Sequence, residues 1–405
     1  MSTSLVYHAF GAKTYDYVRT EYREGTVYFH LRKKRARRRC VACRSRNVTL
    51  GGVEHYSLRT LPIGSRPVFL VLELHVLNCT GCGALRQESR DVADARKSYT
   101  RNFARYVIEL SRQMTMLAIA RHLGVGWDLV KEIIKAHLTK RARRRSWRKV
   151  RCIAIDEIAV RKGHRYMTVV LDLDTGAVLY SAPGKDKKAL EGFFARLRRA
   201  RAKLEAIAVD MSEAFANAIR EYWPGEVAVV HDHYHIVSNM NEVIDRVRRD
   251  EQNRIEGEGK KLIKGSRYLL LRAREKLVEL PDKQARLDAL LAVNETLHKV
   301  YLLKEDLRLF WSQESKKEAE QFIETWLCEA KAMDNRHLTR FANTVESHLD
   351  TILAWYDHPI TTGPLEGLNN KIKVLKRTAY GYRDLEFFGL RLQFIHESTL
   401  QLTAA

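Results

Sequence analysis

The chain has 405 residues, 45% of them apolar and only 7 of them proline, which is enough for two or three domains with a substantial core. Its formal net charge of +22, spread from residue 32 to residue 377, predicts a polyanionic partner, with nucleic acid favoured over an anionic membrane. No window approaches the roughly 20 uncharged apolar residues of a membrane span, and the N-terminus lacks the apolar core of a signal peptide. We therefore expect a cytoplasmic protein in a reducing compartment, where paired cysteines indicate metal binding more readily than disulfides.

Residues 1–95 are expected to form a small β module that binds zinc. Weak alternation over residues 16–30, with a turn at Glu24-Gly25, and an apolar run over residues 68–74 predict strands. The module also carries two Cys-x-x-Cys pairs, the pattern of a four-thiolate zinc site, formed by Cys40, Cys43, Cys79 and Cys82. Because protein sulfurs would fill all four positions, this zinc is predicted to be structural.

A run of basic residues leads directly into the first cysteine pair. Seven of the eight residues from 32 to 39 are Lys or Arg. A solvated surface or a flexible segment would account for such a run, but its position beside the cysteines favours contact with phosphate. The side chains predicted to make that contact are those of Arg37, Arg38 and Arg39.

Residues 96–148 are predicted to form a helix-turn-helix domain followed by a basic linker. An apolar helix over residues 115–123 is stopped by Gly124, and a second amphipathic helix follows, positioned to enter a major groove. A plain helical hairpin is the alternative. We expect the basic block at residues 139–149 to lie on DNA, although it could also be a solvated helix end; the predicted contacts are Arg141, Arg143, Arg144 and Arg145.

From residue 149 to residue 237 the pattern changes to strands. Three strands, a helix, a strand, a helix and a strand follow in order, which is typical of a ribonuclease-H-like fold whose first and fourth strands lie side by side. The first strand carries Asp156 in an apolar run and the fourth ends at Asp210, so the two carboxylates could share a divalent metal. Glu157 is expected to point to the opposite face and to have a structural role.

The third carboxylate is expected far downstream. Residues 238–358 are rich in helix formers and read as an α-helical insertion, after which residues 359–405 return to the core. Gly363-Pro364 signals a helix start and places Glu366 in the first turn, with Asn370 and Lys373 on the same face. The alternative is a glutamate that only complements the helix dipole.

Together these motifs resemble the ISL3 family of bacterial insertion-sequence transposases. The resemblance covers residues 38 to 395 and rests on the cysteine pairs, the helix-turn-helix, Ile155-Asp156-Glu157 followed by residues 161–164 (Arg-Lys-Gly-His), Val209-Asp210-Met211, and residues 364–373 (Pro-Leu-Glu-Gly-Leu-Asn-Asn-Lys-Ile-Lys). It implies a DDE triad at Asp156, Asp210 and Glu366, with Lys373 at the lysine position seven residues later and Arg377 as a further DNA contact.

The resemblance also indicates an auxiliary motif, Asp232-x-x-His235. Related transposases carry Cys or Asp, two further residues and His at this place, where the pair would position DNA or support the active site. A histidine satisfied near a strand end is the plainer explanation. Asp232 is also a rival to Asp210 as the second metal ligand.

The function expected is therefore DNA transposition. The N-terminal domains would bind terminal inverted repeats, and Mg²⁺ or Mn²⁺ at the triad would support cleavage and then strand transfer into target DNA. Assembly on two ends implies a homodimer or larger oligomer associated with the bacterial nucleoid, without a membrane partner. A nuclease of the same fold that lacks strand transfer and a DNA-binding regulator with a decayed catalytic domain are the alternatives.

Overall fold

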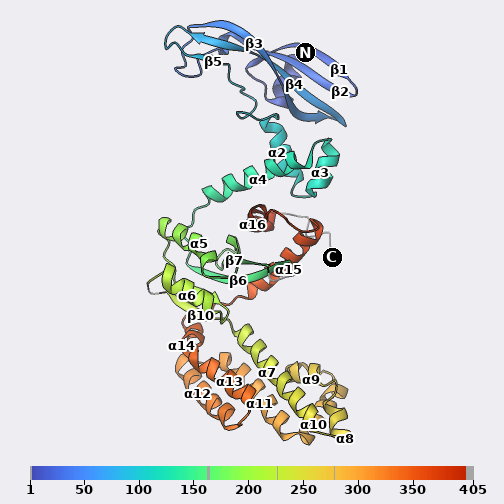
Figure 1. The fold of residues 1–405 in the computed structure, drawn as a ribbon, viewed down its shortest axis with the longest axis vertical. Helices are drawn as coiled ribbons and strands as arrows, with labels where there is room; N and C mark the ends of the chain where they lie inside the picture. The colour runs from blue at the N-terminus through green and yellow to red at the C-terminus, as the bar shows by residue number, and fades with distance from the viewer. Residues whose placement is uncertain (1, 162–164, 226, 278, 398–405) are drawn as a thin grey trace. The chain divides into compact units, whose positions relative to one another are not determined.

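The computed structural model describes residues 2–161, 165–225, 227–277 and 279–397, so residues 162–164 of the Arg-Lys-Gly-His motif lie outside the described part. The chain divides into two compact units (Figure 1). In the described part of the chain, the first comprises residues 2–144, 374–382 and 396–397, and the second comprises residues 145–373 and 383–395. In the described part of the chain, no helix is long and apolar enough to cross a membrane.

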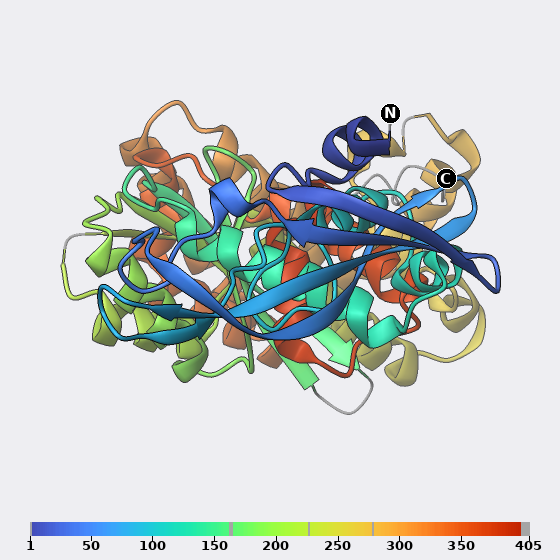
Figure 2. The same ribbon diagram turned by 90° about the horizontal axis from the view of Figure 1, so that it is seen from above.

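The first unit contains a five-stranded sheet with one helix before it. The strand order is β1-β2-β4-β3, with β5 paired to β4. Along β4 every second side chain is buried, which gives the sheet one apolar face against its core. Strand β3 was not predicted from the sequence, whereas part of β4 was; both long strands are also seen in Figure 2. The elements are α1 (Ser2–Phe10), β1 (Tyr15–Arg23), β2 (Thr26–Lys33), η1 (Arg35–Arg37), β3 (Val48–Ile63), β4 (Arg66–Cys79) and β5 (Leu85–Gln87).

The predicted helix-turn-helix is confirmed within the same unit. It consists of α2 (Arg101–Leu110), α3 (Met116–Leu123) and α4 (Trp127–Arg144). The Thr115 side chain caps α3 by accepting a hydrogen bond from the backbone N–H of Ala118, and Gly124 ends it with φ of 61°, a left-handed conformation that glycine adopts without strain. A buried Arg59 donates from Nη2 to the Leu123 carbonyl at 2.9 Å, so the sheet holds the turn directly.

The second unit is built around another five-stranded sheet. Its strand order is β10-β9-β6-β7-β8; β6 pairs with β9 in parallel, as the predicted adjacency of the first and fourth strands requires. Aromatic residues of α5 and α6 pack on the apolar side chains of β6 and β9. The elements are β6 (Cys152–Arg161), β7 (Arg165–Asp172), β8 (Val178–Pro183), α5 (Lys188–Arg199), β9 (Ala206–Val209), α6 (Glu213–Tyr222) and β10 (Ala228–His231).

A long segment follows β10, and in its described residues it is helical, with a core of its own. Buried Ile, Leu, Val and Phe side chains from several helices form that core, including Ile244, Val300 and Phe310. We name it the helical segment (Figure 1); it comprises α7 (His233–Arg254), α8 (Gly257–Ile263), α9 (Arg267–Leu271), η2 (Arg274–Lys276), α10 (Pro281–Val293), α11 (Glu295–Leu309), η3 (Phe310–Ser312), α12 (Lys316–Ala332), α13 (Arg336–Ser347), α14 (Leu349–Leu353) and η4 (Ala354–Tyr356).

Among the described residues, three elements follow the helical segment: α15 (Gly363–Thr378), α16 (Leu385–Gln393) and η5 (Ile395–Glu397). The predicted helix start at Gly363-Pro364 is therefore confirmed. Helix α16 lies close against β8, because a Cβ atom at Gly389 would meet the Ser181 Oγ at 2.7 Å. Only glycine permits this approach.

Candidate metal centres and nucleic-acid interface

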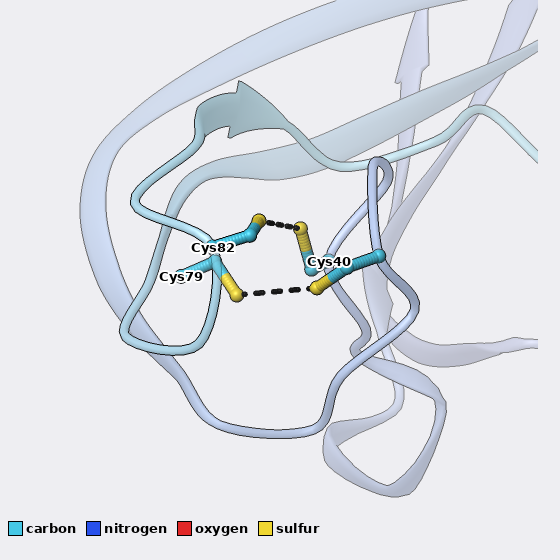
Figure 3. A group of neighbouring side chains, drawn as sticks. Cys40, Cys79 and Cys82 are labelled. Atoms are coloured by element: carbon cyan, nitrogen blue, oxygen red, sulfur yellow. Dashed lines mark hydrogen bonds between the residues drawn. The ribbon is translucent and has the colours of Figure 1, made fainter.

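The four cysteines of the two Cys-x-x-Cys pairs meet at one end of the first sheet. Their Sγ atoms all lie within 4.8 Å of one another. The sulfurs of Cys40 and Cys82 lie 3.7 Å apart (Figure 3), and those of Cys43 and Cys79 lie 3.6 Å apart. Each close contact joins one pair to the other, so all four sulfurs converge on a single point.

Both cysteine pairs lie on tight turns that the backbone itself closes. The N–H of Arg44 donates to the carbonyl of Cys40, and the N–H of Gly83 donates to the carbonyl of Cys79. The residue after each pair adopts a left-handed conformation, with φ of 62° at Arg44 and 67° at Gly83. The antiparallel pairing of Val48 with Cys79 then brings the two turns together. The sulfurs are thus placed by local structure and one strand pairing.

The cluster has the chemistry of a metal site. The backbone N–H of Cys43, with that of Ala42, lowers the pKa of the Cys40 thiol to about 6. The backbone N–H of Ala84 lowers the pKa of the Cys82 thiol, but hydrogen bonds with Cys43 and Cys40 outweigh it and raise that pKa to about 12. Thiolate is the form that binds metal, so Cys40 is the thiol of this cluster that ionises most readily. Four sulfurs leave no position for a substrate, which fits a structural metal ion. The cluster can therefore hold a metal ion, as the spacing predicted.

The second candidate centre lies on the sheet of the second unit. The pairing of β6 with β9 ends at Ala154 opposite Ala208. Asp156 and Asp210 each lie two residues beyond this last pair, so continuing the register makes them level with each other. Because side chains alternate between the two faces of a sheet, both carboxylates then point to the same face as Ala154 and Ala208. Asp156 and Asp210 are therefore brought together by strand register.

The electrostatics of this pair show negative charge held in a partly buried place. Burial raises the pKa of Asp210; His235 and the Ser212 N–H oppose the increase, and the nearby Asp156 adds to it. Burial also raises the pKa of Glu157; the charge of Lys185 opposes the increase, and the charges of Asp210 and Asp156 add to it. Carboxylates crowded in this way fit a divalent cation. Sequence reasoning gave Glu157 a purely structural role and did not anticipate its part in this charge cluster.

Glu366, the third predicted ligand, is exposed on the first turn of α15. All three carboxylates are described, and their oxygens do not all lie within 4.8 Å of one another. Another residue of α15, Asn369, does reach the sheet: its Nδ2 donates to Asp156 Oδ2 at 3.2 Å. Asn369 was missed; its spacing of one helical turn from Glu366 is the signal that could have found it.

Asp232 lies next to this site but has other partners. The pairing of β9 with β10 places Asp232 level with Asp210, yet the Asp232 side chain is 1% exposed. Its Oδ1 accepts from Thr361 Oγ1 at 2.8 Å and its Oδ2 accepts from Thr362 Oγ1 at 2.5 Å. We call these bonds the clasp, because they join the residue before α7 to those before α15. Because its carboxylate is buried within the clasp, Asp232 is a weaker candidate for metal binding than Asp210.

The predicted DNA-binding residues differ in what they contact. Arg37 and Arg39 are exposed, but Arg38 pairs with the buried Glu88 at 3.1 Å. Helix α4 extends through Arg144, so the basic block predicted as a linker is in large part a helix end that carries Arg141, Arg143 and Arg144. Its last predicted contact, Arg145, donates from Nη1 to the Val178 carbonyl at 2.8 Å within the second unit.

The other predicted positions on α15 face outward. Asn370 and Lys373 are exposed, and Lys373 Nζ donates to Asn370 Oδ1 at 3.4 Å. Arg377 is exposed near the end of the helix. His235, in the first turn of α7, lies close enough to Asp210 to oppose the rise in its pKa. The structure therefore brings His235 to the carboxylates and leaves the α15 cations on the surface.

A helix-turn-helix joined to a carboxylate-bearing sheet defines a class of proteins that bind DNA and act on it with metal ions. The family described as transposase of the ISL3 type matches residues 153–392, and the helix-turn-helix domain of transposase family ISL3 matches residues 88–138. The chain therefore belongs to the ISL3 family of transposases, as its motifs predicted.

Individual relatives agree with this assignment. The transposase for insertion sequence element IS1001 of Bordetella parapertussis is 36% identical over 342 residues, covering 83% of each chain. The transposase for IS1557 of Mycobacterium tuberculosis is 30% identical over 352 residues, covering 80% of this chain and 78% of the relative. The Drosophila P element transposase strand transfer complex aligns at 11% identity over 62% of this chain and 78% of that chain, with a TM-score of 0.34.

Proposed function

We propose that this chain is an insertion-sequence transposase that cuts DNA at terminal inverted repeats and joins the freed ends to target DNA. Its second unit would be a ribonuclease-H-like core interrupted by the helical segment, with Asp156, Asp210 and Glu366 as the DDE triad. The observation that supports the proposal is the parallel pairing of β6 with β9, which runs to Ala154 opposite Ala208, two residues before Asp156 and Asp210 respectively.

In this proposal the carboxylates have distinct tasks. Asp156 lies within β6 and Asp210 just beyond β9, so the rigid sheet holds both. Glu366 would complete the set from the first turn of α15, on the same helix as Asn369, which already contacts Asp156. Two Mg²⁺ or Mn²⁺ ions bound there would stabilise the attacking and the leaving oxygens of an in-line displacement. Burial is the main cause of the raised pKa of Asp210, and cations bound there would favour its ionised form.

DNA recognition is assigned to the first unit. A zinc ion in the four-cysteine cluster would hold its loops, α4 would enter a major groove, and Arg37, Arg39, Arg141, Arg143 and Arg144 would contact phosphates. Lys373 and Arg377 on α15 would hold DNA near the carboxylates. Because transposition acts on two ends, the active assembly would contain at least two copies of the chain.

The experiment is an assay with linear DNA carrying the inverted repeats of the element that encodes the chain. Asp156→Ala, Asp210→Ala and Glu366→Ala are each expected to lower cleavage by at least about 10³-fold while sequence-specific binding persists. Asp174→Ala is the control, since Asp174 is exposed at the opposite end of β7 and pairs with Arg151.

Each outcome has a defined meaning. Cleavage that survives one of the three changes refutes the assignment of that residue. Cleavage without joined products identifies a nuclease instead of a transposase. Loss of activity in Asp174→Ala as well would mean that the assay reports general damage to the sheet.

A further inference from the structure

The Asp156 carboxylate is held by one hydrogen bond on each oxygen. The backbone N–H of Glu157 donates to Oδ1 at 2.7 Å, and Asn369 Nδ2 donates to Oδ2 at 3.2 Å. A carboxylate oxygen has two lone pairs, so each oxygen keeps one for another partner. The two bonds therefore orient the carboxylate plane without using up its capacity to bind a cation.

Asn369 is also placed to relate α15 to the sheet. It follows Glu366 by three residues, so the two side chains lie on one helical face about one turn apart. Asn369 is half-buried, whereas its neighbour Asn370 is exposed. The Asn369 Oδ1 is buried and has no hydrogen-bond partner among the described residues. Its amide thus joins the helix that carries Glu366 to the strand that carries Asp156.

The neutral amide is well suited to this position. A lysine or arginine here would orient Asp156 equally well, but its charge would compete with a cation for the carboxylate. A second carboxylate would add repulsion to a cluster that already contains Asp210 and Glu157. An amide donates a hydrogen bond and leaves the negative charge of the cluster in place.

We propose that Asn369 is a positioning residue that orients the Asp156 carboxylate for divalent metal and sets the place of α15 relative to it. This inference rests on the proposed function, since it takes Asp156 as a metal ligand. Partners that orient a metal ligand commonly contribute 10- to 100-fold to metal affinity or activity. Loss of the Asn369 amide is therefore expected to weaken metal binding at the carboxylates without removing any ligand.

The test is Mn²⁺ binding to the full-length, zinc-loaded chain, followed through the electron paramagnetic resonance signal of free Mn²⁺. Asn369→Ala and the volume-conserving Asn369→Leu are each expected to weaken Mn²⁺ binding by about 10-fold or more. Asn343→Ala is the matched control, because Asn343 is an exposed asparagine in the middle of α13. Circular dichroism verifies that each variant retains its helix content.

DNA cleavage supplies a second measurement. Because all three ligands remain in Asn369→Ala, raising Mn²⁺ by about the factor lost in affinity is expected to restore cleavage, whereas Asp156→Ala stays inactive at any concentration. If both Asn369 variants bind Mn²⁺ like Asn343→Ala while Asp156→Ala does not bind, the inference about Asn369 is wrong and the triad stands. If Asp156→Ala binds Mn²⁺ like the unmodified chain, then Asp156 is not a metal ligand. In that case the proposed function is wrong, and the inference about Asn369 that rests on it is wrong as well.

Discussion

The two candidate metal centres of this chain are built in opposite ways. In the four-cysteine cluster, each pair lies on one turn, the pairs are 36 residues apart at their nearest, and the sulfurs already converge. In the carboxylate centre, Asp156 and Asp210 are 54 residues apart, Glu366 follows after a further 156, and the three sets of oxygens do not yet meet. The four cysteines therefore already form a full set of ligands. The carboxylate centre would be complete only if α15 brought Glu366 to the two aspartates.

The net charge also differs between the N-terminal part of the chain and the helical segment. Residues 1–144 contain 28 Lys and Arg against 11 Asp and Glu, whereas residues 233–356, the helical segment, contain 21 of each. The positive charge is thus concentrated in the unit with the cysteines and the helix-turn-helix, more than the spread along the sequence suggested. Under the proposed function, recognition of DNA and placement of the third carboxylate would therefore belong to different parts of the chain.

The largest effect is expected from breaking the cysteine cluster. Cys79→Ser removes a fully buried ligand, so zinc should be lost and the cysteine turns should unfold, because structural zinc supplies folding free energy. We expect DNA affinity to fall by about 100-fold or more while Mn²⁺ binding at the carboxylates is unchanged. Atomic absorption and gel-shift titration measure this. The exposed Cys328→Ser is the control, and zinc retained by Cys79→Ser would contradict the assignment.

A smaller effect is expected from loosening the clasp. Thr362→Val removes a hydroxyl that donates to the buried Asp232, and a hydrogen bond to a charged group contributes about 1.5–3 kcal/mol. If the clasp holds α15 in place, cleavage should fall by roughly 10- to 100-fold, with zinc content and DNA binding unchanged. Thr362→Ser keeps the hydroxyl and should restore cleavage. Full activity in Thr362→Val would show that α15 is placed by other contacts.

A pH effect is expected where β10 meets the helical segment. His231 is buried, and its Nε2 lies 3.2 Å from His348 Nδ1; burial, and then the charge of His348, lower its pKa to about 4. An unfolded histidine titrates near 6.5, so the folded state disfavours protonation. The stability from this group is full above pH 6.5 and is lost as the pH falls toward 4.

For His231 the loss should reach about 2 kcal/mol at pH 5, because the unfolded state binds the proton more tightly. Urea unfolding of the second unit at pH 8 and pH 5 measures it. His231→Gln should flatten this dependence, and an unchanged pH dependence in that variant would assign the effect to other groups. Zinc content at pH 8 serves as the reference for an undamaged first unit.

The smallest effects concern single arginines beside the cysteines. Arg37→Ala and Arg39→Ala should each weaken DNA binding a few-fold and lower the slope of log affinity against log salt by about 1, because each would lose one phosphate contact. Arg38→Ala should instead lower stability, since it leaves Glu88 buried without its cation. Salt titrations and thermal unfolding separate the two results, and a lowered salt slope for Arg38→Ala would contradict this division.

Much of the fold was predictable because local chemistry determines it. The Cys-x-x-Cys spacing, the glycine stop at Gly124, the strand runs around Asp156 and Asp210, and the Gly363-Pro364 helix start each depend on a few neighbouring residues. Strand β3 was missed because its burial pattern is mostly exposed, so it shows little apolar alternation. The basic block at residues 139–149 was read as a linker because charge alone does not reveal that α4 extends through Arg144.

The sequence by itself determined the ligand types, the helix-turn-helix and the family, because these reside in residue identity and short spacing. Only the tertiary structure decided which groups meet: Asn369 instead of Glu366 at Asp156, Glu157 near the charges of both aspartates, and Asp232 bonded to Thr361 and Thr362 in the clasp. The physical reason is that these contacts depend on strand register and on how α15 returns to the sheet after the helical segment, and neither is encoded within any short stretch of the chain.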